Sequence, residues 1–135
     1  MVASPLVRFK TAEVAKEFAQ IRVPLQLIVD DFARFCNASG YELVLTDCLS
    51  SAADDARLGR VSNSHREGRA VDVSVKSWPE EFIIRAVAWL ERVYGYKGAV
   101  SKSDGKRRLV VRHNVASPTT GQLLGDHLHL QIARG

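Results

Sequence analysis

Residues 64–75, SHREGRAVDVSV, carry polar side chains whose types and spacing could bind a metal ion. The segment is typical of a loop that runs into a buried strand, in which side chains two residues apart share a face. Asp72 then lies on the face opposite to its valine neighbours, with Ala70 small enough to leave space beside it. Gly68 lets the backbone bend or approach another element closely, which would bring His65 toward Asp72. An imidazole and a carboxylate can therefore meet at one point.

The C-terminal segment HLHLQI, residues 127–132, repeats this pattern. His127, His129 and Gln131 alternate with leucine and isoleucine, so one face of the expected strand is apolar and the other carries two imidazoles. A catalytic zinc ion needs three nitrogen or oxygen ligands from the protein and one open position. One histidine and one carboxylate from the first segment, with one histidine from the second, meet that requirement.

Hydrolysis of an amide bond is the chemistry that such a site could perform. Zinc lowers the pKa of a bound water molecule to about 7 and polarises a carbonyl group. The reaction also needs a group that moves a proton, and Asp126, three residues before His129, is the candidate. His127 could stabilise the tetrahedral intermediate or share the proton transfer. Asp126 has an alternative role as a turn residue after Gly125.

The two segments together resemble the motifs of a known family. HREGRAVD followed by DHLH is similar to the HxxGxAxD motif and the C-terminal histidine of the zinc DD-peptidase and phage endolysin family. This family includes D-Ala-D-Ala carboxypeptidases and L-alanyl-D-glutamate endopeptidases, and it shares its core with the hedgehog signalling domain. The resemblance covers about residues 41–133. It implies that His65, Asp72 and His129 hold one Zn²⁺ ion and that Asp126 is the general base.

The resemblance also implies a function, namely that of a zinc metallopeptidase acting on peptidoglycan stem peptides that contain D-amino acids. A cell-wall-lytic endopeptidase of a phage or prophage is the first expectation. The alternatives are a D-Ala-D-Ala carboxypeptidase and a module of the same fold that retains zinc without catalysis. We expect a monomer whose partner is the peptide part of peptidoglycan, with no nucleic acid and no membrane as partner.

The residues that would hold the substrate depart from the family pattern. Many members carry an arginine shortly after the second strand, where this chain has Ser50. Arg57 or Arg60 from the following loop could replace that arginine. Members usually have a serine two positions before the first histidine, where this chain has Asn63, so that Ser64 is the third candidate for a contact with the substrate.

Local patterns predict the elements that must position these residues. Apolar side chains at helical spacing predict helices over 12–21 and from Pro24 to about 37–40. Ser77 and Glu80 suggest a capping box, with Pro79 in the first turn, for a further helix that ends at Gly95. Strands are expected at 41–46, 70–75 and 127–132, and in a hairpin around 104–105 that continues into a strand over 107–113.

These elements predict an α+β fold in a single domain over 1–135, with a helical part at 1–40 and a motif-bearing core at 41–135. A small antiparallel sheet would bear the zinc site, and helices would pack on its other face. Cys36 and Cys48 lack the spacing of a metal or disulfide motif and are expected to be buried reduced thiols. His113 is expected to be structural or at the surface.

Charge and composition limit the expected partners and location of the protein. The net charge of +4 favours polyanions but does not choose among them, and the chain lacks the motifs of a nucleic-acid reader. Its first residues contain no long apolar run, so neither a signal peptide nor a membrane-spanning helix is expected. The expectation is therefore synthesis in the cytoplasm and action on the cell wall after release or as part of a virion.

Overall fold

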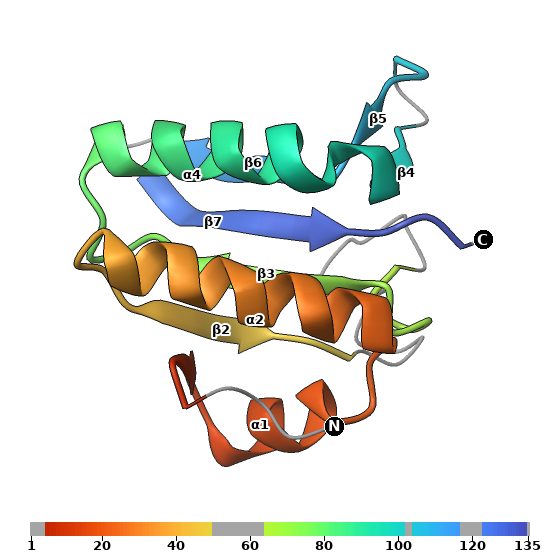
Figure 1. The fold of residues 1–135 in the computed structure, drawn as a ribbon, viewed down its shortest axis with the longest axis horizontal. Helices are drawn as coiled ribbons and strands as arrows, with labels where there is room; N and C mark the ends of the chain where they lie inside the picture. Colours follow the sequence, from red (N-terminus) through yellow and green to blue (C-terminus); the bar gives the residue numbers. More distant parts are fainter. Residues whose placement is uncertain (1–4, 50–63, 102–103, 117–122, 135) are drawn as a thin grey trace.

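A computed structural model of the chain describes residues 5–49, 64–101, 104–116 and 123–134. Within these residues the main sheet has five strands in the order β1-β2-β3-β7-β6, and β4 and β5 form a separate pair. Helices α2 (Val23–Ala38) and α4 (Glu80–Tyr94) lie side by side over one face of the main sheet (Figure 1). Helix α1 (Ala12–Phe18) lies beside the edge formed by β1 and β2. The predicted α+β fold is confirmed.

The strands that bear the candidate site are antiparallel. β2 (Leu43–Asp47) pairs with β3 (Ala70–Ser74), β3 pairs with β7 (Leu123–Gln131), and β7 pairs with β6 (Val110–Ala116). An additional short strand, β1 (Val7–Phe9), runs parallel to β2 and makes the sheet mixed. The sequence did not predict β1, because three residues are too few for an alternating pattern to be recognised.

The strand expected over 107–113 is divided between the two sheets. β5 (Arg107–Arg108) pairs with β4 (Ala99–Val100), whereas β6 begins at Val110 and joins the main sheet. Between them, Leu109 is fully buried and its backbone N–H donates to Oε1 of Glu91 on α4 at 2.6 Å. This contact holds the chain at the point where it passes from one sheet to the other.

The capping box expected at 77–80 is not formed. Helix α4 begins at Glu80, its N-cap is Pro79 in an extended conformation, and no side chain caps it. Ser77 therefore lies two positions too early to be the N-cap, and Glu80 instead forms an ion pair with Arg112, with 2.5 Å between Oε2 and Nη1. The helix ends before Gly95, as predicted, and the 3₁₀ turn η1 (Gly95–Lys97) follows.

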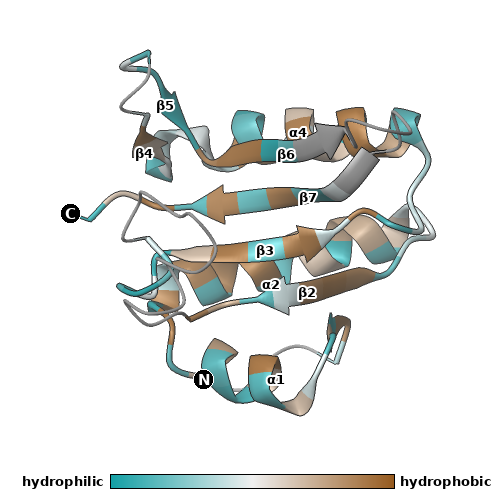
Figure 2. Ribbon diagram, turned by 180° about the vertical axis from the view of Figure 1, so that it is seen from behind, coloured by the Kyte–Doolittle hydropathy of each residue, from teal (hydrophilic) through white to brown (hydrophobic). Residues whose placement is uncertain are grey.

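The core lies between the main sheet and the two long helices. Val71 and Val73 on β3 and Leu128 and Leu130 on β7 are fully buried in it, together with apolar residues of α2 and α4. Neighbouring residues in a strand point to opposite faces, so Asp72 and His129 lie on the face away from these helices, the face toward the viewer in Figure 2. The two cysteines are buried and free, as predicted. None of the described helices is long and apolar enough to cross a membrane.

Candidate metal centre

Strands β3 and β7 bring two predicted ligands directly opposite each other, since Asp72 and His129 are partners in the antiparallel register. His65 reaches the same point from the loop before β3. Its Nε2 atom lies 3.3 Å from Oδ1 of Asp72, and Nδ1 of His129 lies 3.0 Å from the same oxygen. One ligand atom from each of the three residues lies within 4.8 Å of the others, and the described part of the chain contains no further group of this kind.

The two distances to Asp72 suit a tetrahedral zinc site. Two atoms that are each about 2.0 Å from a tetrahedrally coordinated zinc ion lie about 3.3 Å apart. The distances from Oδ1 of Asp72 to the two imidazole nitrogens, 3.3 and 3.0 Å, are close to this value. Three protein ligands leave the fourth position for water or substrate, as in catalytic zinc sites.

The outer nitrogens of the two imidazoles lie close to oxygen acceptors, as in histidines that bind a metal through the other nitrogen. Nδ1 of His65 lies 2.7 Å from the carbonyl oxygen of Cys48, and Nε2 of His129 lies 3.1 Å from Oε1 of Gln131. Both oxygens accept hydrogen bonds, so each contact is satisfied by the tautomer that has its proton on the outer nitrogen. In that tautomer of the neutral imidazoles, Nε2 of His65 and Nδ1 of His129 turn lone pairs toward Asp72. With a proton on the inner nitrogen instead of a metal ion beside it, each imidazole can donate to Asp72. Lone pairs that converge in this way are suited to a cation.

Asp72 is ionised in this setting. Burial raises the pKa of its carboxyl group, but hydrogen bonds and charge interactions with His129 and His65 outweigh burial and hold the pKa well below the ordinary value of 3.8. The carboxylate is the form that binds a metal ion. The charge of this carboxylate is therefore complementary to a divalent cation.

Gly68 positions the loop that carries His65 for both of the reasons expected from the sequence. Its φ angle is +69°, a value that residues with a side chain rarely adopt. A Cβ atom at this position would also lie 3.2 Å from Cα of Ile21. Its carbonyl oxygen accepts a hydrogen bond from the backbone of Arg22 at 3.0 Å. The loop is also held by Arg69, which is 7% exposed and donates from Nη1 to the carbonyl of Ile132.

His127 lies next to the three ligands without belonging to their group. Its Nε2 atom is 3.8 Å from Oδ1 of Asp72, and its Nδ1 atom is 2.5 Å from the carbonyl oxygen of Gly125. Nδ1 therefore donates, and the lone pair of Nε2 is on the side of Asp72. This arrangement suits a group that accepts a proton beside the metal ligands.

The structure adds a residue that the sequence did not assign to the site. His113 on β6 is the register partner of His127, and its ring centroid lies 5.2 Å from that of His127 and 5.6 Å from that of His129. Although His113 is exposed overall, local burial of its ring and then the neighbouring His129 and His127 lower its pKa from the ordinary value of 6.5. The imidazole of His113 is therefore mainly neutral at neutral pH. All four histidines of the chain thus meet on one face of the sheet.

Asp126 does not join this cluster, contrary to the role that the resemblance implies. Its carboxylate accepts two hydrogen bonds from Arg112, at 3.0 Å from Nε and 2.8 Å from Nη2. Arg112 is the register partner of Leu128 on the apolar face and also binds Glu80 at the start of α4. Alternation along β7 likewise puts Asp126 on the face of Leu128. Asp126 is therefore bound to Arg112 and not to the three candidate ligands.

Of the residues expected to contact the substrate, only Ser64 is among the described residues. Ser50, Arg57, Arg60 and Asn63 lie outside the described residues. Ser64 is 1% exposed, and its carbonyl oxygen accepts from the backbone N–H of Arg69 at 2.8 Å. This hydrogen bond helps to hold the loop that carries His65.

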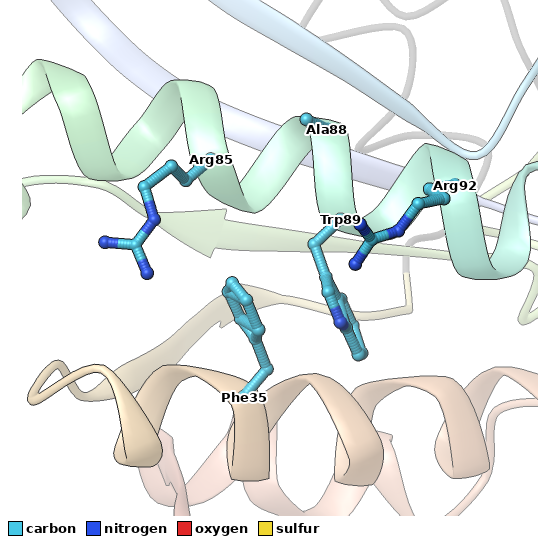
Figure 3. A pocket seen from close by; sticks show the side chains of 5 residues that line it. All are labelled: Phe35, Arg85, Ala88, Trp89 and Arg92. Atoms are coloured by element: carbon cyan, nitrogen blue, oxygen red, sulfur yellow. The ribbon is translucent and has the colours of Figure 1, made fainter.

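A pocket of about 300 Å³ lies on the opposite side of the sheet from the histidines. It is formed between α2 and α4, with Phe35, Trp89, Arg85 and Arg92 around it (Figure 3). Its two guanidinium groups and aromatic rings are separated from the metal ligands by the buried core. This pocket is therefore distinct from the candidate metal centre.

Comparisons of the chain with family models, with curated proteins and with solved structures found no significant match.

Proposed function

We propose that the chain is a zinc-dependent peptidase that hydrolyses an amide bond in peptidoglycan stem peptides. The observation that carries this proposal is the convergence of Nε2 of His65, Nδ1 of His129 and Oδ1 of Asp72, with the outer nitrogen of each imidazole held by an acceptor. Peptidoglycan as the substrate rests on the resemblance of HREGRAVD and DHLH to the motifs of zinc DD-peptidases and phage endolysins. An endopeptidase of a phage or prophage is the favoured form.

The chain's own residues supply the remaining requirements of the reaction. When bound, zinc would act as a Lewis acid that polarises the scissile carbonyl and activates water. His127 would accept the proton that water loses, because its Nδ1 donates to Gly125 and its Nε2 keeps a lone pair beside Asp72. The protonated His127 could then donate to the leaving amine. Packing of β3 and β7 against the core holds these groups in place.

A non-catalytic zinc-binding module is the second candidate. The observation that favours it is the ion pair of Asp126 with Arg112, since the general base implied by the resemblance lies away from the metal ligands. A module of this kind would keep the three ligands and the outer hydrogen bonds. Such a module would not require His127 to accept a proton through Nε2.

Digestion of purified peptidoglycan tests these alternatives. Walls of several chemotypes are incubated with the zinc-loaded protein, with and without a chelator, and new termini are identified by mass spectrometry. We expect cleavage that the chelator and the substitution His65→Ala both abolish. A new terminus within the stem peptide indicates an endopeptidase, whereas release of terminal D-alanine alone indicates a carboxypeptidase.

The matched control is Ser74→Ala, which changes a β3 residue on the same face as Asp72 without removing a proposed ligand. Ser74→Ala should cleave as the wild type does. Binding of one zinc ion per chain without cleavage of any wall would favour the non-catalytic module. Failure of the wild type to bind zinc would reject both candidates.

A further inference from the structure

His113 lies beside His127 and His129 in the histidine cluster. It lies across from His127 in the pairing of β6 with β7, so the two imidazoles stand on the same face of the sheet. Their ring centroids are 5.2 Å apart with an angle of 34° between the planes. His113 is exposed, whereas His65 and Asp72 are 3% and 7% exposed. A ligand that approaches the three metal ligands from solvent can therefore meet His113.

The imidazole of His113 is available for such a ligand. Among the residues that the structure describes, none forms a hydrogen bond with either ring nitrogen of His113. By contrast, the other three imidazoles are each oriented by an oxygen acceptor: the Cys48 carbonyl, the Gly125 carbonyl and the Gln131 amide. A neutral imidazole always carries one N–H donor, which His113 can offer to an incoming group.

We propose that His113 is a ligand-contacting residue that donates its N–H to a tetrahedral oxyanion held beside the three metal ligands. In the reaction proposed above, on which this inference rests, a water oxygen bonds to the carbonyl carbon. The C=O electron pair moves onto the carbonyl oxygen, and the proton from water passes to His127. Donors aimed at the oxygen that gains charge accelerate such a step. His113 and His127 therefore have different tasks, one as donor and one as proton acceptor.

Binding of inorganic phosphate to the cobalt-loaded protein tests this role without requiring turnover. Phosphate is a stable tetrahedral oxyanion, and the visible absorption of Co²⁺ reports a change in its surroundings. We expect one Co²⁺ per chain in the wild type and in His113→Ala, with affinities within about threefold. Phosphate affinity should fall about tenfold or more in His113→Ala, because a hydrogen bond to a charged group is lost. His113→Gln, which retains an N–H donor, should recover part of the loss.

The control is Val111→Thr, which conserves shape on β6 at the register partner of His129 and should bind phosphate as the wild type does. Equal phosphate affinity in His113→Ala and the wild type, or no phosphate binding by the cobalt-loaded wild type, would overturn the role of His113 alone. Loss of Co²⁺ from His113→Ala would make His113 a metal ligand and overturn it too. Failure of the wild type to bind Co²⁺ would reject the metal centre and with it both proposals.

Discussion

Nδ1 of His129 lies 3.0 Å from Oδ1 of Asp72, although the two residues are 57 positions apart in the chain. The antiparallel pairing of β3 with β7 makes them direct partners. In the neutral tautomer that donates from Nε2 to Gln131, Nδ1 of His129 carries a lone pair and faces the Asp72 carboxylate as a second acceptor. Two acceptors at this distance are stabilised by a cation between them, which is the physical basis of the proposed zinc site.

Substitution of Asp72 by asparagine should weaken zinc binding strongly. The amide keeps the shape of the side chain but removes the charge that the buried cluster offers to the ion. We expect a loss of affinity above about 100-fold, more than changes outside the ligand set usually cost. Competition with a chromophoric chelator measures it, with Ser74→Ala as the control on the same strand. Wild-type affinity in Asp72→Asn would refute the proposed ligand set.

Gln131 should raise the affinity of the site for zinc without binding the ion itself. Its Oε1 atom accepts from Nε2 of His129 and so holds the orientation and protonation of that imidazole. Gln131→Ala should lower zinc affinity about tenfold or more, in the range found when outer partners of metal-bound histidines are removed. Gln131→Glu retains an acceptor and should lose less. If both variants bound zinc as the wild type does, Gln131 would have no part in orienting His129.

Asp126 should contribute to stability and not to metal binding. The hydrogen bonds from Arg112 hold the pKa of Asp126 below its ordinary value of 3.8. Its folded pKa is therefore lower than its unfolded pKa, so its stabilisation is present above pH 3.8 and is lost as the pH falls through the folded pKa. Asp126→Asn should lower the free energy of unfolding at pH 7 by about 1 kcal/mol and flatten its dependence on pH in the acid range.

Urea unfolding at several pH values measures this effect, and zinc titration of the same variant provides the comparison. Zinc affinity should equal that of the wild type, because Asp126 faces Arg112 and Glu80 on the side of α4. Peptidase activity should also fall less than about tenfold. A loss of 100-fold or more with zinc still bound would restore Asp126 as the general base.

Gly68 and Gly105 form a matched pair for testing how the loop that carries His65 is held. Both have positive φ, +69° and +70°, but only at Gly68 does an added Cβ meet backbone atoms, at 3.2 Å from Ile21. Each substitution by alanine should cost about 1 kcal/mol for the left-handed conformation. Gly68→Ala should cost clearly more in urea unfolding and should also weaken zinc binding. Equal costs for the two variants would show that the contact with Ile21 does not constrain this loop.

The sequence by itself determined the local parts of the site. Alternation along 70–75 and 127–132 separated the polar faces from the apolar faces correctly, since side-chain direction in a strand follows from the backbone alone. The same rule, applied one residue further, would have put Asp126 with Leu128 on the apolar face. The motif resemblance outweighed that signal, and the structure shows Asp126 bound to Arg112.

Only the tertiary structure decided which segments became neighbours. Nothing in the local pattern states that β7 lies between β3 and β6 or that Asp72 faces His129, because strand order and register depend on how the whole core packs. The same packing brought His113 beside His127, although its own segment carries no motif. Local periodicity therefore defined the faces of the strands, while the pairing of distant strands assembled four histidines and one aspartate on a single face.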